Sequence, residues 1–245
     1  MASLGSQAPH CLKYAIFAGS SKDSKMDEKV LKYVVKVVRD TRHDTLLFGP
    51  DSMDVPFVKK PVHYYSDRSQ APEWLRDAEK KLEQCDGFIY LCPEVNRSIP
   101  PNLANFIDHF GSNIYQAKPA AIITYSDNDS SGSIWVSNLL SIKLMSLSAH
   151  ILPCFLHIPR QNIPSDHEDD SEKNSSEHST EIGATAVKNG EAGSTKQSRA
   201  STSDTKLQMC RMIEQFDWLA KALAFRKEGS PFPSKGPSNL SVRFE

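Results

Sequence analysis

One polar loop of this sequence, residues 19–30, carries side chains that suit the binding of a phosphate group. It follows an apolar run and opens a helical pattern, and the first turn of a helix offers backbone N–H groups to an anion. Ser20 and Ser24 add hydroxyl donors. Lys22 and Lys25 add positive charge. The pattern indicates an anion site, and the alternative is a solvated helix cap, which polar residues of these types also form.

A second loop joins an apolar strand to a helix and reads Pro-Glu-Val-Asn-Arg-Ser-Ile-Pro-Pro over residues 93–101. Open α/β sheets bind ligands at the carboxyl ends of their strands, so this loop stands where a ligand would lie. A third polar loop, at 125–133, follows another apolar strand. Its Asp, Asn and Ser residues form turns readily, and it fits a ligand contact and a solvent-facing turn equally well.

Strands and helices alternate along the chain and would position these three loops. Apolar runs indicate five strands, at 12–18, 44–49, 87–92, 119–126 and 150–157. Apolar residues at helical spacing predict helices around 30–38, 103–114, 136–147 and 209–223. The alternation predicts an α/β fold. It fits a flavodoxin-like, doubly wound sheet of five parallel strands in the order 2-1-3-4-5, with its ligand crevice between the first and third strands.

The composition changes sharply at residues 161–204. This segment contains no Phe, Trp, Tyr, Leu, Met or Cys, and its nine acidic and four basic residues give a net charge of −5. It cannot bury enough apolar surface to offset its ordering entropy, so we predict a disordered, acidic, Ser-rich insert before the last helix. The flavodoxin-like domain is predicted at 12–160, after a loose N-terminus at 1–11. A C-terminal helix at 205–227 completes the domain, and a flexible tail follows at 228–245.

Charge and composition narrow the class of function. Outside the insert the chain has 25 basic and 21 acidic residues, a mild excess that suits a phosphate-bearing cofactor and is too small for nucleic-acid binding. The sequence shows no secretion signal and no apolar run long enough to span a membrane, which predicts a cytoplasmic protein. Its five cysteines form no disulfide or metal-binding pattern. The eight histidines show no catalytic spacing with the carboxylates, so we predict no catalytic triad and no metal site.

The loop at 93–101 resembles the flavin-contacting loop of the NADPH-dependent FMN reductase family of flavodoxin-like quinone reductases. The family motif reads P-E-Y-N-x-S-I-P-x-x-L-K-N, and the matching residues are Glu94, Asn96, Ser98, Ile99, Pro100, Leu103 and Asn105. Val95 replaces the Tyr of the motif and Ala104 replaces the Lys. The resemblance covers about residues 12–159 and the last helix.

The first loop is similar to the phosphate loop of the same family, G-S-x-R-P-G-R-x-G-E-K-V, with matches at Gly19, Ser20, Glu28, Lys29 and Val30. Lys22 and Lys25 stand at the two Arg positions, where they act as point charges without the bidentate fork of Arg. Asp23 and Asp27 replace Pro and Gly. Carboxylates near a dianionic phosphate oppose its binding, so we expect weakened FMN affinity.

The resemblance implies FMN as cofactor, with NADPH or NADH as electron donor. It implies that the phosphate is held by Ser20, Lys22, Ser24 and Lys25. The flavin ring would be lined by Pro93, Glu94, Val95, Asn96 and Ser98. In the third loop Tyr125 and Ser126 match the family, which places Ser126 at the other edge of the ring, whereas most of the family's glycines and its Arg are missing.

The implied function is that of a flavoprotein oxidoreductase, which passes electrons from NAD(P)H to quinones, azo compounds or free flavin. The family forms homodimers or homotetramers, and neither a nucleic-acid nor a membrane partner is expected. The alternative is a catalytically impaired flavodoxin-like protein that binds or regulates partners through its acidic insert. The changes at Val95 and Ala104 favour the alternative. The retained Glu94, Asn96 and Ser98 favour the reductase, which is the interpretation that we prefer.

Overall fold

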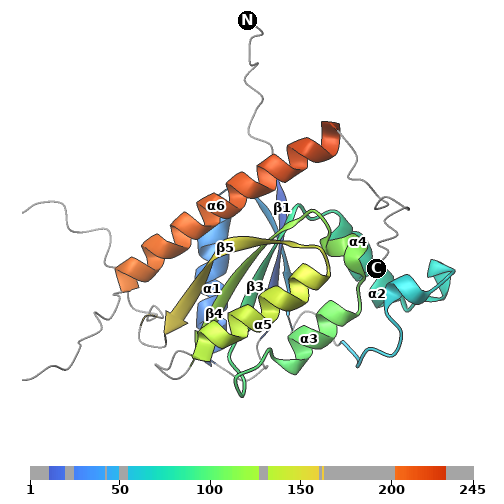
Figure 1. Cartoon of the computed structure of the whole chain (residues 1–245), viewed down its shortest axis with the longest axis horizontal. Helices are drawn as coiled ribbons and strands as arrows, with labels where there is room; N and C mark the ends of the chain where they lie inside the picture. The colour runs from blue at the N-terminus through green and yellow to red at the C-terminus, as the bar shows by residue number, and fades with distance from the viewer. Residues whose placement is uncertain are drawn as a thin grey trace, which may run out of the picture.

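Five parallel strands form the centre of the molecule, in the order β2-β1-β3-β4-β5 (Figure 1). The computed structural model describes residues 11–19, 25–41, 43–49, 55–126, 132–159, 162 and 202–229. The strands are β1 (Lys13–Ala18), β2 (Asp44–Phe48), β3 (Gly87–Pro93), β4 (Pro119–Ser126) and β5 (His150–Pro159). The strand order and the parallel pairing of all four neighbouring pairs confirm the predicted fold.

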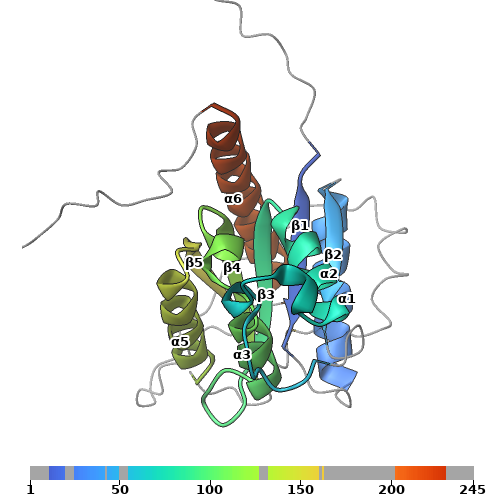
Figure 2. The same ribbon diagram turned by 90° about the vertical axis from the view of Figure 1, so that its right-hand side faces the viewer.

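Helices cover both faces of the sheet (Figure 2). One face carries α2 (Glu73–Glu83), α3 (Pro101–Asp108), α4 (Ser112–Tyr115) and α5 (Gly132–Ser146). The other carries α1 (Lys25–Asp40) and α6 (Thr202–Gly229), and two short 3-10 helices, η1 (Val62–Tyr64) and η2 (Arg68–Gln70), precede α2. Side chains alternate along a strand, so Phe88 and Tyr90 face α2–α5 whereas Ile89 and Leu91 face α1 and α6. The helices in the described part of the chain are too short or too polar to cross a membrane.

The helical pattern predicted at 103–114 is divided between two helices. Its apolar residues are buried as expected, but α3 ends at Asp108 and α4 begins at Ser112. Gly111 lies between them, and a β-carbon at this position would approach the His63 ring nitrogen Nδ1 to 2.8 Å. The Val62 backbone N–H also donates to the His109 carbonyl at 2.8 Å, so η1 lies against the segment between α3 and α4, a contact that helical periodicity alone does not reveal.

The helix α6 begins earlier than the sequence predicts. Residues 202–204, assigned above to the disordered insert, form its first turn, and the helix continues two residues into the predicted tail. The side-chain amide of Asn162 donates a 3.0 Å hydrogen bond to the hydroxyl of Thr205, and both residues are buried. This contact holds the first turn of α6 close to the residue that follows the end of β5. The helix therefore begins before residue 205, where the composition of the sequence changes. The rest of the insert and of the tail lies outside the described residues.

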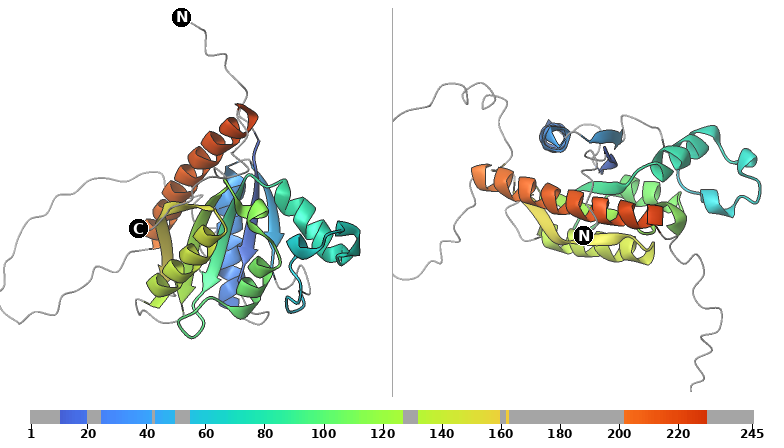
Figure 3. Two further views of the ribbon diagram at one scale, coloured as in Figure 1. Left: turned by 45° about the vertical axis from the view of Figure 1, so that its right-hand side comes forward. Right: turned by 90° about the horizontal axis from the view of Figure 1, so that it is seen from above.

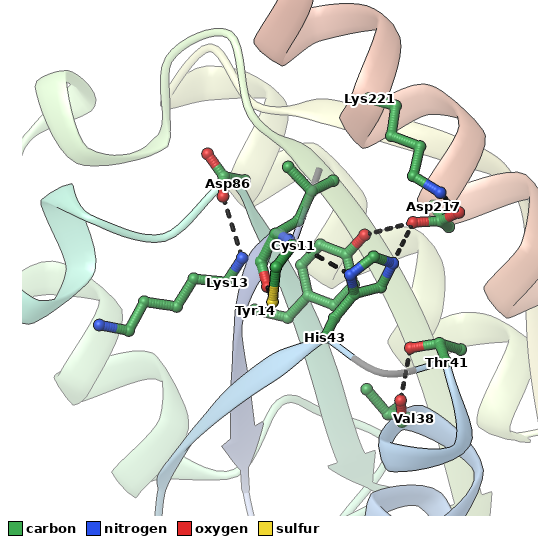
Figure 4. Close-up of polar contacts among 10 residues, drawn as sticks. Cys11, Lys13, Tyr14, Val38, Thr41, His43, Asp86, Asp217 and Lys221 are labelled. Atoms are coloured by element: carbon green, nitrogen blue, oxygen red, sulfur yellow. Dashed lines mark hydrogen bonds and ion pairs between the residues drawn. The ribbon is translucent and has the colours of Figure 1, made fainter. Parts of the chain in front are cut away.

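A partly buried carboxylate, that of Asp217, anchors α6 to the sheet (Figure 4). Oxygen Oδ1 of Asp217 accepts a 2.8 Å hydrogen bond from the Tyr14 hydroxyl and lies 2.6 Å from Nε2 of His43, while Oδ2 lies 2.7 Å from the Lys221 ammonium. The Leu12 backbone N–H donates to the other ring nitrogen of His43 at 3.2 Å. These contacts join α6 to the starts of β1 and β2, at the amino edge of the sheet.

The strand β5 forms one edge of the sheet and is irregular near its start. One residue of β4 opposes three residues of β5, 152–154, so the chain bulges outward there. Figure 3 shows α6 (orange) running along the sheet beside β5 (yellow). An open groove of about 490 Å³ lies between the bulge and α6, lined by Leu152, Pro153, Glu214, Gln215, Trp218 and Leu219. This groove lies on the amino half of β5, away from the loops that the sequence assigns to a ligand.

Candidate functional site at the carboxyl edge

The predicted ligand loops follow β1, β3 and β4, whose carboxyl ends meet at one edge of the sheet (Figure 1). At the end of β1, the Gly19 backbone N–H donates a 2.8 Å hydrogen bond to the Leu91 carbonyl. A β-carbon on Gly19 would lie 3.0 Å from that carbonyl oxygen and 3.0 Å from the Leu103 side chain. A side chain would be crowded here, so glycine fits best, and the start of the loop at 19–30 is held directly against β3 and α3.

The Pro-Glu loop, residues 93–101, contains a tight turn. The Ser98 N–H donates to the Val95 carbonyl at 2.9 Å, and the Val95 N–H donates to the Ser98 carbonyl at 3.3 Å. Between them, Asn96 and Arg97 have φ values of 51° and 58°, the positive values that a type I′ turn requires. Asn adopts this conformation readily and Arg does not. The turn leaves Val95 42% exposed, so it presents an aliphatic side chain at the edge.

Glu94 supplies a buried hydrogen-bond acceptor at this edge, to which none of the described residues donates. Its backbone N–H donates to the Tyr125 carbonyl at 3.0 Å, which ties the Pro-Glu loop to β4. Its carboxylate oxygen Oε2 is buried and has no hydrogen-bond partner among the described residues. A buried polar atom without a partner is rare and costly, so this oxygen fits a ligand that brings its own donor. The imide N–H and the ribityl hydroxyls of a flavin are donors of this kind.

Asn105, the last residue of the Pro-Glu motif, holds a second loop in place. Its side-chain oxygen accepts a 2.8 Å hydrogen bond from the Val58 backbone N–H, and its side-chain nitrogen donates to the Pro56 carbonyl at 2.9 Å. The ring nitrogen Nε2 of His109 lies 2.9 Å from the same carbonyl. Both contacts come from α3 and its end. Asn105 therefore fixes residues 55–58 beside α3, a structural role that the motif match alone does not reveal.

Tyr125, the residue before the end of β4, connects two of the ligand loops. Its side chain is 2% exposed and lies on the face covered by α1 and α6. The phenol hydroxyl donates a hydrogen bond to the carboxylate of Asp27 in the first turn of α1. Burial and the nearby Asp27 charge raise the pKa of Tyr125 well above its usual range, so the phenol stays a donor at neutral pH.

A row of three side chains lies one register step inside the edge, on the face covered by α5. Cys92, Thr124 and His157 are paired neighbours on β3, β4 and β5. The Thr124 hydroxyl lies 2.5 Å from Nδ1 of His157, whose pKa is lowered by burial. Burial raises the pKa of the Cys92 thiol to about 12, so this cysteine stays protonated at neutral pH. The row therefore packs beneath the edge and offers no thiolate nucleophile.

The structure brings together the part of the predicted cofactor site that it describes. Pro93, Glu94, Val95, Asn96 and Ser98 lie in one loop, and Ser126 ends β4 beside it, half-buried.

The predicted phosphate contacts are only partly described. Ser20, Lys22 and Ser24 lie outside the described residues, as does the loop at 127–131, and Lys25 is the first residue of α1 with its side chain not described. The phosphate contacts therefore stay predictions.

Comparison with known sequences identifies relatives of this chain. A sequence profile of the NADPH-dependent FMN reductase family matches residues 12–162. A 2-hydroxy-1,4-benzoquinone reductase from a Burkholderia species is 26% identical over 116 residues, which are 46% of this chain and 59% of the relative. The chain thus spans less than two thirds of the length of this relative.

Comparison with solved structures gives the same fold. FerB, a flavoenzyme NAD(P)H:(acceptor) oxidoreductase from Paracoccus denitrificans, superposes with a TM-score of 0.54 at 20% identity, over 86% of this chain and 98% of FerB. An oxidoreductase from Corynebacterium diphtheriae superposes with a TM-score of 0.54 at 13% identity, over 87% of this chain and 98% of the other. Identities this low show a shared fold and no more.

Proposed function

Because the chain belongs to the NADPH-dependent FMN reductase family, whose cofactor is FMN and whose electron donor is NAD(P)H, we propose that it is an active oxidoreductase. In this proposal, its electron acceptors are quinones, azo compounds or free flavin, and the protein is located in the cytoplasm. The hydride and electron chemistry is supplied by FMN when it is bound. The residues of this chain therefore have positional tasks: they bind the cofactor, orient it and shield one side of it.

The observation that carries the proposal is the buried oxygen Oε2 of Glu94, which lacks a partner among the described residues at the edge where the family binds its flavin. In the proposed complex this oxygen accepts a hydrogen bond from the cofactor. Pro93, Val95 and Asn96 line the ring with backbone and side-chain atoms, Ser98 closes the turn, and Ser126 borders the opposite edge. The phosphate is assigned to Ser20, Lys22, Ser24 and Lys25, an assignment that rests on the sequence resemblance.

The proposal also includes a second copy of the chain. The outer side of α5 is apolar, with Trp135 60%, Ile142 61% and Met145 54% exposed. These residues fall on one stripe of the helix, and exposed apolar stripes of this kind are typical of protein–protein interfaces. Since α5 follows the loop after β4, a homodimer or homotetramer formed through this stripe would lie next to the carboxyl edge.

The test is the flavin content of the purified protein, followed by an NAD(P)H–quinone assay. After soaking in FMN and desalting, the protein should retain bound flavin and oxidise NADPH or NADH in the presence of a quinone. Glu94→Ala should release the flavin, whereas the matched change Glu83→Ala, at an exposed position of α2, should not. A protein that retains no FMN and shows no NAD(P)H oxidation would overturn the proposal in favour of the catalytically impaired binding protein.

A further inference from the structure

Arg97 lies at the tip of the turn in the Pro-Glu loop, in a conformation that suits glycine better than arginine. Its φ is 58°, and two backbone hydrogen bonds between Val95 and Ser98, of 2.9 and 3.3 Å, close the turn around it. Turns of this type most often have glycine at this position, because a β-carbon is strained there. Strained residues of this kind cluster at binding and catalytic sites. The turn would form more easily with glycine, so the reason for an arginine is to be sought in its side chain.

The Arg97 side chain presents a positive charge at the carboxyl edge of the sheet. Arg97 is the only basic residue of the loop at 93–101. Its side chain is exposed, and none of the described residues pairs with its guanidinium group. Pro93 is buried and Arg97 is exposed, so the loop runs from the interior to the surface between these two residues. A flavin ring held by Glu94 and its neighbours would therefore have this guanidinium at its solvent-facing rim.

The chemistry of a guanidinium group indicates which ligand it would bind there. Guanidinium stays charged at neutral pH and binds phosphate through two parallel hydrogen bonds. Two ligands of the proposed reaction carry phosphate, and that of FMN is assigned to the loop after β1. The other ligand, NADH or NADPH, approaches from solvent and must bring its nicotinamide against the flavin ring. A single ribose separates the nicotinamide from the pyrophosphate, whereas the 2′-phosphate of NADPH lies beyond a second ribose. A cation at the rim of the ring is therefore nearest to the pyrophosphate.

We propose that Arg97 recognises the dinucleotide, with its guanidinium group on the pyrophosphate of NADH and NADPH alike. The proposal rests on the proposed function and adds to it the residue that binds the electron donor. The closed turn fixes the backbone from which the guanidinium reaches, so less order has to be gained when the dinucleotide binds. Because both dinucleotides carry the pyrophosphate, Arg97 does not by itself favour NADPH over NADH.

The test compares the FMN-loaded native protein with Arg97→Gln, by measuring kcat/KM for NADH, NADPH and reduced nicotinamide riboside at a saturating quinone concentration. The variant should lose about tenfold with both dinucleotides, the loss expected for one hydrogen bond between charged groups. Reduced nicotinamide riboside has no pyrophosphate, so its kcat/KM should be the same in both proteins. Arg39→Gln, at an exposed position in the last turn of α1, is the matched control and should change none of the three values.

Binding of the oxidised dinucleotides gives a measurement that does not depend on turnover. In isothermal titration calorimetry, the dissociation constants of NAD⁺ and NADP⁺ should be about tenfold higher for Arg97→Gln, and added salt should weaken binding to the native protein more than to the variant. Arg97→Lys keeps the charge without the planar fork and should fall between the two. Arg97→Gly should lose as much dinucleotide affinity as Arg97→Gln without losing thermal stability, because glycine suits the turn. This combination separates ligand binding from folding.

Each other outcome decides against the proposal. A loss confined to NADPH would assign Arg97 to the 2′-phosphate, and an equal loss with the riboside would show a general disturbance of the ring pocket. Weaker binding of FMN but not of riboflavin would assign Arg97 to the cofactor phosphate. Unchanged values in Arg97→Gln would overturn the role of Arg97 and leave the proposed function intact. A native protein that retains no FMN and oxidises neither dinucleotide would overturn the proposed function, and the role of Arg97 with it.

Discussion

Tyr14 and Asp217 lie 203 residues apart in the sequence and share a 2.8 Å hydrogen bond that joins β1 to α6. The carboxylate also contacts His43 and Lys221. Burial by itself would raise the pKa of Asp217, but the hydrogen bonds from Lys221 and Tyr14 and the nearby His43 outweigh it and hold this pKa below its ordinary value of 3.8. The ionised carboxylate is therefore the form that stabilises the fold.

Asp217→Asn should lower the free energy of unfolding by about 2 kcal/mol at pH 7, because it weakens hydrogen bonds to a charged group. A carboxyl whose pKa is lower in the folded protein contributes stability above its unfolded pKa, and this contribution is lost as the pH falls through the folded pKa. The difference between native protein and variant should thus be constant from pH 7 to about pH 5 and disappear in stronger acid. Urea denaturation at several pH values measures it. A difference that grows in acid would contradict this account, and Lys221→Gln, at an exposed position, serves as the control with a loss below about 0.5 kcal/mol.

Lys118 stabilises the C-terminal end of α2 from inside the protein. Its side chain is buried, and its ammonium donates to the Leu82 carbonyl at 2.8 Å and the Glu83 carbonyl at 3.2 Å. Lys118→Met should lower the free energy of unfolding by about 2 kcal/mol, since it removes a charged donor from these carbonyls at a helix end. Lys143→Met is the matched control, because its partner Asp108 is exposed and surface ion pairs contribute less than about 1 kcal/mol. Equal losses in the two variants, measured by thermal unfolding, would disprove the capping role.

Arg97 occupies a left-handed conformation that favours glycine. With φ at 58°, Arg97→Gly should raise the stability by about 0.5 kcal/mol, because relief of the left-handed strain exceeds the entropy that glycine adds to the unfolded chain. Asn96→Gly should have little effect, since Asn tolerates positive φ. Differential scanning calorimetry of both variants provides the measurement. A loss of stability in Arg97→Gly would mean that the side chain makes a contact worth more than the strain.

The hydrogen bond between Asn162 and Thr205 indicates which residues of the insert can be removed without loss of stability. Replacing residues 163–201 with a short Gly-Ser linker keeps both partners and should leave a single cooperative unfolding transition near the native temperature. Deleting 161–204 also removes Asn162 and the first turn of α6, so this variant should be less stable by about 1 kcal/mol or more. The two deletions are compared by thermal unfolding. Equal stability would show that the Asn162 contact contributes nothing.

The apolar stripe on α5 is the proposed interface between two copies of the chain, so a charge placed in it should disrupt their association. Ile142→Lys places a charge in the stripe at a position that is 61% exposed, so the monomer should stay folded while the proposed dimer should dissociate. Leu207→Lys is the matched control, because Leu207 is 51% exposed on α6, and it should leave the assembly unchanged. Light scattering after size-exclusion chromatography gives the mass. A native protein that is monomeric at tens of micromolar would refute the interface.

The strand positions could be predicted from the sequence because the strands of a parallel sheet are buried on both faces and read as apolar runs. Phe88 to Leu91 is such a run. The place of this strand next to β1 in the sheet follows from the spacing of the strands and helices along the chain. The contacts that organise the site could not be predicted in the same way. Asn105 meets Val58 across 47 residues, and Tyr125 meets Asp27 across the sheet. Such contacts depend on how the elements come together, which local residue patterns do not encode.

The bulge at 152–154 has a consequence for how copies of this protein meet. An edge strand normally offers a row of unpaired N–H and carbonyl groups to which another strand can add, and this is a route to aggregation. In β5 the row is interrupted by the bulge, and Pro153 within it has no N–H to donate. A sixth strand therefore cannot pair along the full length of this edge. The distortion protects the β5 edge from the addition of another strand while leaving the helical surfaces available for regular assembly.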